Sequence, residues 1–397
     1  MMSLAASSNM LILSVFESEL RGLEEKHLLR NIISRDSMQG PVITIAGKKY
    51  LNFSSNDYLG LSGSPEIVQA VQKSLQRYGF GSGSSRLLAG GSVLHKNLED
   101  SIARFKGTES ALIFNSGYSA NTGVIPCITS EDDVIFSDEL NHASIIDGCR
   151  LSRARTLVYR HRDMGRLQAL LKKAKARRRL VITDTVFSMD GDLAPLNDIC
   201  EICVRSGAVL YLDDAHGTGV LGGGRGALAH FGLKAEPWII QMGTFSKALG
   251  SFGAFVAGSE DVIKWISNAV RSFIFSTALP SSVIAAAAAG LRLVQRNPAL
   301  VGKLWSNRER LYDGLKSLGY EDSASMTPIL TIRADRVSKV LGLSKYLYGK
   351  GIYVPAIRPP SVIGPRLRLT VTAAHTERQI DKLLAELKKA EIGAASQ

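Results

Sequence analysis

The sequence contains little cysteine, with four residues in 397, at positions 127, 149, 200 and 203. So few and so scattered cysteines exclude the disulfide framework of a small secreted protein and favour a reducing, cytoplasmic location. Cys200 and Cys203 form a single C-x-x-C pair on an expected helix, without a second pair or a nearby histidine. We interpret this pair as buried helix packing and assign no metal site.

Long apolar runs are also missing. No stretch approaches the roughly 20 residues that a helix needs to cross a bilayer. Residues 10–13 are apolar, but the N-terminal segment 1–16 lacks the basic residues that open a signal peptide. We therefore expect no membrane partner and no targeting peptide, and we interpret residues 1–16 as an ordered arm or a frayed extension.

Acidic residues are fewer than basic ones, 36 against 48, which gives a formal net charge of +12. Such a charge favours an anionic partner: nucleic acid, an anionic cofactor or an acidic carrier protein. The densest basic run, residues 172–179, contains no aromatic residue and follows an expected helix at 165–171, whose C-terminal dipole it complements. We expect no nucleic-acid partner, although a basic nucleic-acid-binding protein on a catalytically inactive fold remains the alternative from another class.

Short apolar runs alternate with amphipathic stretches through the middle of the chain. This alternation predicts an α/β fold, a mostly parallel central sheet covered by helices. The seven runs are residues 111–114, 133–136, 155–159, 180–183, 208–212, 238–240 and 253–257.

Asn297-Pro298 marks a break, beyond which helices and strands alternate in a pattern typical of a smaller α+β lobe. We expect helices at 300–318, 337–350 and 377–392 and strands at 329–332 and 351–354. The predicted division is an N-terminal segment at 1–55, a large domain at 56–296 and a small C-terminal domain at 297–397. No internal repeat is visible, which argues against a solenoid.

Two chemically complementary residues follow successive predicted strands. Asp213 closes the run 208–212, and Lys247 follows the run 238–240. Ligands of such sheets collect at the carboxyl ends of the strands. A lysine and an acid placed there indicate pyridoxal phosphate, which needs an amine for its aldehyde and a carboxylate that keeps its pyridine nitrogen protonated. Asp214 competes for the second role, but strand alternation points it to the opposite face, and Asp213 has a three-residue spacing to His216.

Further polar residues lie at the same expected edge. Gly117 and Tyr118 stand between a strand and a helix, where free N–H groups can hold a phosphate or simply form a turn. His142 can stack on a cofactor ring or hydrogen-bond at a helix start. Ser188 and His216 are candidates for the cofactor's phenolic oxygen. Thr244 is a candidate for its phosphate.

Near the C-terminus, Arg366 and Arg368 share one face of a predicted strand. A guanidinium can grip an α-carboxylate with two hydrogen bonds. The alternative is a pair of solvated arginines on an edge strand.

From about Leu51 to His375 the chain resembles the α-oxoamine synthase family of fold-type I pyridoxal phosphate enzymes. The resemblance implies a fold-type I transferase in which Lys247 binds the cofactor covalently, Asp213 pairs with the pyridinium and His142 stacks on the ring. It places Gly117 and Tyr118 at the phosphate and lets Ser188, His216 and Thr244 complete the cofactor site. The stretches that carry the resemblance are residues 51–61, 137–144, 186–191, 213–220, 356–360 and 366–375.

The same resemblance implies the substrate residues and the assembly. Arg368 binds the amino-acid carboxylate, Asn56 also contacts substrate, and Arg30 and Ser361 contact the acyl substrate or product. Thr277 resembles a residue that the partner subunit contributes to the phosphate site, so a homodimer with shared active sites is expected. Two departures stand out: Ser361 occupies a position where related enzymes often have threonine, and residues 222–226 are unusually rich in glycine.

The implied activity is that of an acyltransferase. The resemblance favours the decarboxylative condensation of L-alanine with a pimeloyl thioester of coenzyme A or acyl-carrier protein, a step of biotin biosynthesis, with Lys247 as the base. Condensation of glycine with acetyl-CoA remains an alternative, because family members share the same chemical residues.

Overall fold

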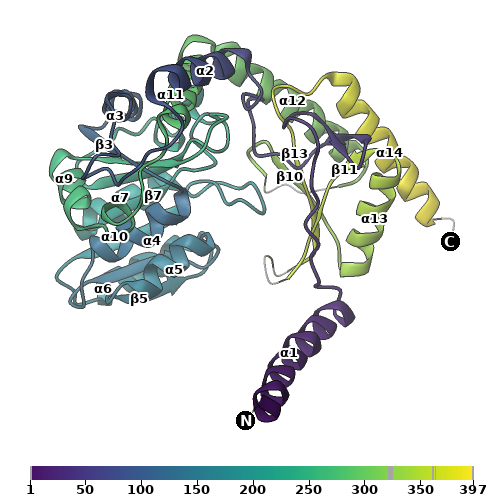
Figure 1. Cartoon of the computed structure of the whole chain (residues 1–397), viewed down its shortest axis with the longest axis horizontal. Coiled ribbons are helices and arrows are strands. Elements are labelled where there is room, and N and C mark those ends of the chain that lie inside the picture. The colour runs from purple at the N-terminus through teal and green to yellow at the C-terminus, as the bar shows by residue number, and fades with distance from the viewer. Residues whose placement is uncertain (1, 321–324, 360–361, 363, 396–397) are drawn as a thin grey trace.

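The computed structural model describes residues 2–320, 325–359, 362 and 364–395. Figure 1 shows a large lobe and a smaller lobe, with the first helix projecting away from both. Helices α11 (Ser281–Arg296) and α12 (Pro298–Ser317) run across the top of the two lobes. Asn297 lies between them and Pro298 is the first residue of α12, the place where proline is best tolerated in a helix.

The large lobe is built on a seven-stranded sheet with the order β3-β9-β8-β7-β6-β4-β5. Only β9 runs antiparallel to its neighbours, and the other pairs are parallel. This arrangement confirms the predicted α/β class, and each of the seven apolar runs overlaps a strand. The strands are β3 (Ser110–Phe114), β4 (Val134–Asp138), β5 (Arg155–Tyr159), β6 (Arg179–Asp184), β7 (Val209–Asp213), β8 (Ile239–Thr244) and β9 (Ala254–Gly258).

Alternate residues of each central strand enter two different cores. On β7, Leu210 and Leu212 belong to one buried cluster and Tyr211 to the other. Because both faces are covered by helices, the middle of each strand is apolar on both faces instead of alternating with polar residues, and the polar residues lie mainly at the strand ends. The covering helices are α2 (Pro65–Tyr78), α3 (Val93–Lys106), α4 (Gly117–Cys127), α5 (Ala143–Leu151), α6 (Met164–Lys173), α7 (Leu196–Ser206), α8 (Ala227–His230), α9 (Glu260–Ala269) and α10 (Arg271–Ile274).

The smaller lobe has its own buried cluster, which includes Leu311, Leu347 and Leu369. One three-stranded sheet has the order β10-β13-β12 and the other β1-β2-β11. The elements are β1 (Val42–Ile45), β2 (Lys48–Asn52), β10 (Ile329–Arg333), α13 (Val337–Gly349), β11 (Ile352–Tyr353), β12 (Ala356–Ile357), β13 (Arg366–Thr370) and α14 (Glu377–Ala395).

The N-terminal strands belong to this smaller lobe. β2 pairs in parallel with β11, and Phe53 is fully buried in the small-lobe cluster. Residues 1–55, predicted as a separate segment, are therefore joined to the smaller lobe by a pairing that links residues some 300 positions apart. The domain limits themselves stay a prediction.

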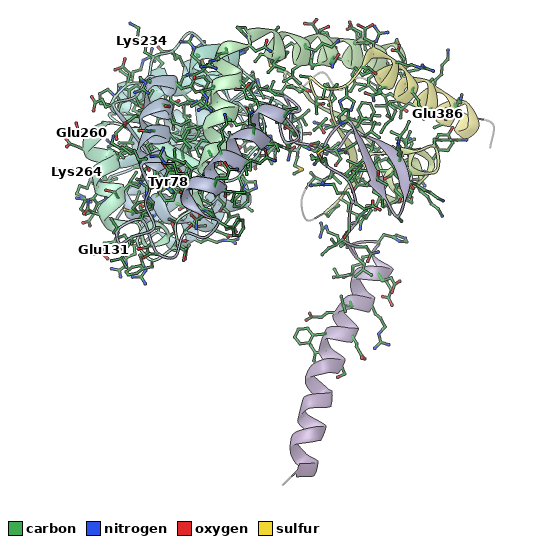
Figure 2. All side chains as sticks on the ribbon, turned by 45° about the horizontal axis from the view of Figure 1, so that its top comes forward. Tyr78, Glu131, Lys234, Glu260, Lys264 and Glu386 are labelled. Carbon is green, nitrogen blue, oxygen red and sulfur yellow. The ribbon has the colours of Figure 1, made fainter. Side chains whose placement is uncertain are left out.

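Residues 2–16 of the expected N-terminal arm belong to a helix, α1 (Met2–Glu25), that extends away from the lobes (Figures 1 and 2). Its apolar side chains Val15, Phe16 and Leu20 are each more than half exposed. Within the described part of the chain, no helix combines the length and the apolarity that crossing a bilayer requires.

Candidate active site

Four parallel strands end at one edge of the central sheet and bring polar side chains together there. Strands β4, β6, β7 and β8 end at Asp138, Asp184, Asp213 and Thr244. Asp184 and Asp213 are register partners on neighbouring strands. Lys247 follows three residues after the end of β8, so the sheet edge carries both the lysine and the carboxylates.

Asp213 is buried and fixed by two hydrogen bonds. Its Oδ2 accepts from Asn121 Nδ2 at 2.8 Å, and its Oδ1 accepts from the Ala215 N–H at 3.0 Å. Burial raises the pKa of Asp213, although the Lys247 cation and the Asn121 hydrogen bond oppose that rise. The adjacent Asp214 has different neighbours, because its carboxylate pairs with Lys106.

Lys247 is half-buried, with its amine close enough to Asp213 and Asp184 to interact with both. Burial lowers the pKa of Lys247 to about 8, even though the two carboxylates oppose the change. Its amine therefore loses a proton more easily than that of an ordinary surface lysine. Burial and the nearby Asp213 raise the pKa of Asp184 well above its usual value.

His142 precedes α5 and acts as its N-cap. Its Nδ1 accepts from the Ser144 N–H at 3.2 Å, which in the neutral ring leaves the proton on Nε2. The ring stands edge-on to Tyr118 with centroids 6.4 Å apart. Partial removal from water, together with the positive Lys247, lowers the pKa of His142, while Asp213 opposes that change. His142 therefore both caps the start of α5 and interacts with Asp213.

A hydrogen-bonded chain connects the two lobes. Arg368, on β13, donates from Nε to the Ser188 carbonyl at 2.6 Å and from Nη2 to Asn56 Oδ1 at 3.1 Å. Tyr58 lies between Asn56 and His216, and its hydroxyl is 2.8 Å from His216 Nδ1. Burial lowers the pKa of His216 well below its usual value, so the ring is neutral at physiological pH.

The two C-terminal arginines have separate roles. Arg366 pairs with Asp190, which also binds Arg333 at 2.9 Å. Both Arg366 and Arg368 are more than nine-tenths buried, so they are not solvated edge-strand residues. Of the two, only Arg368 contacts Asn56 and Ser188 in this structure.

The candidate phosphate residues lie at the start of α4 and the end of β8. The first hydrogen bond within α4 runs from the Ala120 N–H to the Ser116 carbonyl. The N–H groups of Gly117 and Tyr118 come earlier in the helix, where the helix itself offers them no acceptor, so they can bind a phosphate. The Thr244 hydroxyl lies 2.8 Å from the Gly253 carbonyl and 2.6 Å from Ser246 Oγ. Its hydrogen bonds therefore hold the loop that carries Lys247.

The remaining predicted residues have other hydrogen-bond partners or lie outside the described residues. Thr277 is exposed, and its carbonyl accepts from Asn115 at 2.9 Å. Arg30 is exposed and donates to the Pro359 carbonyl at 3.3 Å. Ser361 lies outside the described residues.

Sequence reasoning gave no role to three residues of the cluster. Asn121 holds Asp213, Tyr58 holds His216, and Asp184 accepts the His142 N–H at 2.6 Å. Asp184 directly follows the predicted strand at 180–183, so its position was a usable signal. Tyr58 lies in the stretch 51–61 that carries the family resemblance, which was also a usable signal. Asn121 lies inside a helix, where nothing in the sequence separates it from structural residues.

The donor set fits pyridoxal phosphate. It offers a half-buried amine, a buried carboxylate close enough to interact with that amine, a histidine ring that interacts with both and helix-start N–H groups for a phosphate. Among the described residues, no group of three or more histidine, cysteine or acidic side chains is arranged to hold a metal ion. The Cys200 and Cys203 side chains are both buried on α7, as expected for helix packing.

The chain belongs to the aminotransferase class I and II family, whose profile matches residues 48–387. Among curated relatives, the 8-amino-7-oxononanoate synthase of Geobacter sulfurreducens is 45% identical, over 94% of this chain and 96% of its own length. The chain also resembles a serine palmitoyltransferase from S. paucimobilis that was solved with a bound adduct of pyridoxal phosphate and myriocin. That similarity has a TM-score of 0.90, with 29% identity over 96% of this chain and 98% of the other.

A solved 8-amino-7-oxononanoate synthase from Francisella tularensis is similar as well. The TM-score is 0.76, with 27% identity over 88% of this chain and 99% of that one.

Proposed function

We propose that this chain is a pyridoxal phosphate-dependent acyltransferase with 8-amino-7-oxononanoate synthase activity. It condenses L-alanine with a pimeloyl thioester and releases the thiol and carbon dioxide. The observation that carries the chemistry is the half-buried Lys247 amine facing the buried Asp213 carboxylate at the sheet edge. The choice of substrates is supported by the 45% identity to the Geobacter enzyme over nearly the whole chain.

When bound at this site, pyridoxal phosphate supplies an electron sink for the negative charge that develops at the amino-acid Cα. Asp213 would hold the protonated ring nitrogen, and Asn121 and Ala215 fix the carboxylate for that task. Gly117 and Tyr118 would offer their N–H groups to the phosphate, and His142 would flank the ring. Ser188, His216 and Thr244 complete the proposed cofactor site.

Lys247 acts as the base that removes the Cα proton of L-alanine. A lysine with a pKa near 8 has a substantial neutral fraction at neutral pH, whereas an ordinary lysine has almost none. The substrate Cα then forms a bond to the thioester carbonyl carbon. The thiol leaves, the former α-carboxyl departs as carbon dioxide, and a proton returns to the same carbon.

Arg368 is the proposed carboxylate ligand. Its buried guanidinium is held by Ser188 and Asn56, so the group is pre-oriented and strongly desolvated. A charge-assisted hydrogen bond is strong in such surroundings. Arg30, with Ser361, is proposed to contact the acyl chain.

We also propose that two copies form a cytoplasmic dimer with shared sites. Thr277 forms a bridge with Ser85, and around this bridge lie the exposed apolar side chains of Leu87, Leu88 and Phe275. Exposed apolar groups gathered in this way are typical of an interface.

The four cysteines are free thiols, as a reducing compartment such as the cytoplasm favours.

Substrate choice is tested with the purified holoenzyme and three pairs of substrates, by following thiol release and product mass. We expect turnover with L-alanine and pimeloyl-CoA, or with L-alanine and pimeloyl-acyl-carrier protein. Turnover with glycine and acetyl-CoA alone would instead assign the chain as a glycine C-acetyltransferase.

A further inference from the structure

Lys106 is an unusual lysine that the proposed function does not use. It is the last residue of α3, and its side chain runs inward instead of into solvent. Its Nζ lies 2.8 Å from Asp214 Oδ2, and the two side chains are 1% and 3% exposed. Lysine is almost never so completely buried unless it is paired.

The pair is fully hydrogen-bonded on both sides. Lys106 Nζ also donates to the Arg225 carbonyl at 2.8 Å. Asp214 accepts from Thr185 Oγ1 at 2.7 Å, Thr218 Oγ1 at 2.9 Å and the Ala227 N–H at 3.1 Å. A buried ion pair satisfied in this way holds one geometry, because any displacement leaves a charge or a donor unpaired.

This network explains part of the glycine-rich loop at 222–226. A Cβ on Gly226 would lie 2.0 Å from Asp214 Oδ2 and 2.5 Å from Lys106 Nζ, and its φ of +103° also favours glycine. A Cβ on Gly217 would lie 2.1 Å from Asp214 Oδ1. The backbone can pack against the ion pair at Gly217 and Gly226 only because neither position carries a side chain.

Asp214 belongs to the turn that carries two residues of the candidate cofactor site. Asp213 precedes it, His216 follows two residues later, and the Asp214 N–H binds the Met242 carbonyl of β8 at 2.8 Å. Asp213 and Asp214 bind different side chains from this turn, Asn121 in the cofactor site and Lys106 behind it. Anchoring one carboxylate therefore restricts the other.

We propose that Lys106 is a positioning residue for the cofactor site. By pairing with Asp214 behind the turn, it holds Asp213 and His216 in the orientation that the pyridine ring requires. This inference rests on the proposed function, since it assumes that Asp213 meets the ring nitrogen.

The test uses Lys106→Met, which keeps an unbranched side chain one heavy atom shorter and removes its charge. Apo-protein is titrated with pyridoxal phosphate, and the absorbance of the loaded protein is followed against pH. Because Asp214 loses its buried partner, we expect the dissociation constant of the cofactor to rise about tenfold or more. The pH midpoint of the absorbance change should move upward, since removing a cation favours proton uptake nearby.

Arg104→Met is the matched control, because Arg104 is an exposed cation on the same helix whose guanidinium donates to Ser101 Oγ at 3.3 Å. We expect it to leave both values unchanged. A purely structural role of Lys106 predicts a lower unfolding temperature with both values unaltered in the folded protein, and that result would overturn the proposal.

Thr185→Val serves if Lys106→Met does not fold, since it removes one hydrogen bond to Asp214 and keeps both charges. We expect a smaller rise in the cofactor dissociation constant, about two- to fivefold. A wild-type affinity in this folded variant would count against the proposal. Failure of the proposed function is distinguishable, because then the wild-type protein itself would not bind pyridoxal phosphate.

Discussion

The Lys247 amine sits where burial and two carboxylates act on it in opposite directions, and burial prevails, with a pKa of about 8. The amine is then mainly protonated at pH 7 and mainly neutral at pH 9. Only the neutral amine attacks an aldehyde. We expect the rate at which apo-protein binds pyridoxal phosphate to rise about tenfold from pH 7 to 9 and then level off.

Stopped-flow absorbance measures this rate. A profile that keeps rising toward pH 10.5 would mean that Lys247 has the pKa of a free lysine and that the described burial does not act on it.

Arg368 offers a second test on a single side chain. Arg368→Lys keeps the positive charge, but an ammonium cannot bind Ser188, Asn56 and a carboxylate with the planar geometry of a guanidinium. We expect the KM for L-alanine to rise about tenfold or more, with a smaller change in kcat. Arg333→Lys, on an exposed arginine of β10, is the control. Equal effects of the two substitutions in steady-state kinetics would exclude Arg368 as the specific carboxylate ligand.

At the scale of elements, His161 joins the end of β4 to the loop that carries Ser188. Its Nδ1 lies 3.0 Å from Asp138 and its Nε2 2.7 Å from Asp192. Burial alone would lower the pKa of His161, but the hydrogen bonds to the two carboxylates outweigh it and raise the pKa to about 9.

The sign of the resulting pH dependence follows from that raised value. In the folded protein His161 holds its proton more tightly than an unfolded histidine does, so its contribution to stability is complete below pH 6.5 and is lost as pH rises through about 9. After allowance for solvent screening, we expect about 1–2 kcal/mol of pH-dependent stability to disappear in His161→Gln.

Urea unfolding of wild type, His161→Gln and the exposed control His230→Gln between pH 6 and 9.5 measures this contribution. If wild type and His161→Gln lost stability in parallel over that range, the bridge would have no stabilising role.

At the scale of elements, the sequence was enough to predict the central strands but not the contacts between distant elements. The central strands were recognisable because each is a short apolar run between turn residues, and polar side chains at their ends located the sheet edge. The pairing of β2 with β11 and the contact of Asn121 with Asp213 depend on folding that brings distant residues together. Local sequence patterns do not predict contacts between distant residues. The ion pair of Lys106 with Asp214 could not be predicted for the same reason.

At the scale of the whole molecule, the proposed shared site needs a second copy of the chain. Leu88 is 81% exposed, and its N–H binds the carbonyl of Ser85, which bridges to Thr277. A carboxylate placed in a buried apolar interface is strongly unfavourable. We expect Leu88→Asp to shift the sedimenting species from dimer to monomer and to weaken pyridoxal phosphate binding.

Val204→Asp places the same charge on an exposed position of α7 and should stay dimeric. Analytical ultracentrifugation compares the two variants. A wild-type protein that sediments as a monomer at every concentration would contradict the shared site.

The most direct test of Lys247 as the cofactor-binding lysine is mass spectrometry after borohydride reduction of the protein loaded with pyridoxal phosphate. Reduction fixes the cofactor to the amine that binds it, and digestion locates that amine. We expect the phosphopyridoxyl mass on the peptide that contains Lys247 and on no other. Its appearance on a different lysine, or its absence from a protein saturated with cofactor, would contradict the proposed chemistry.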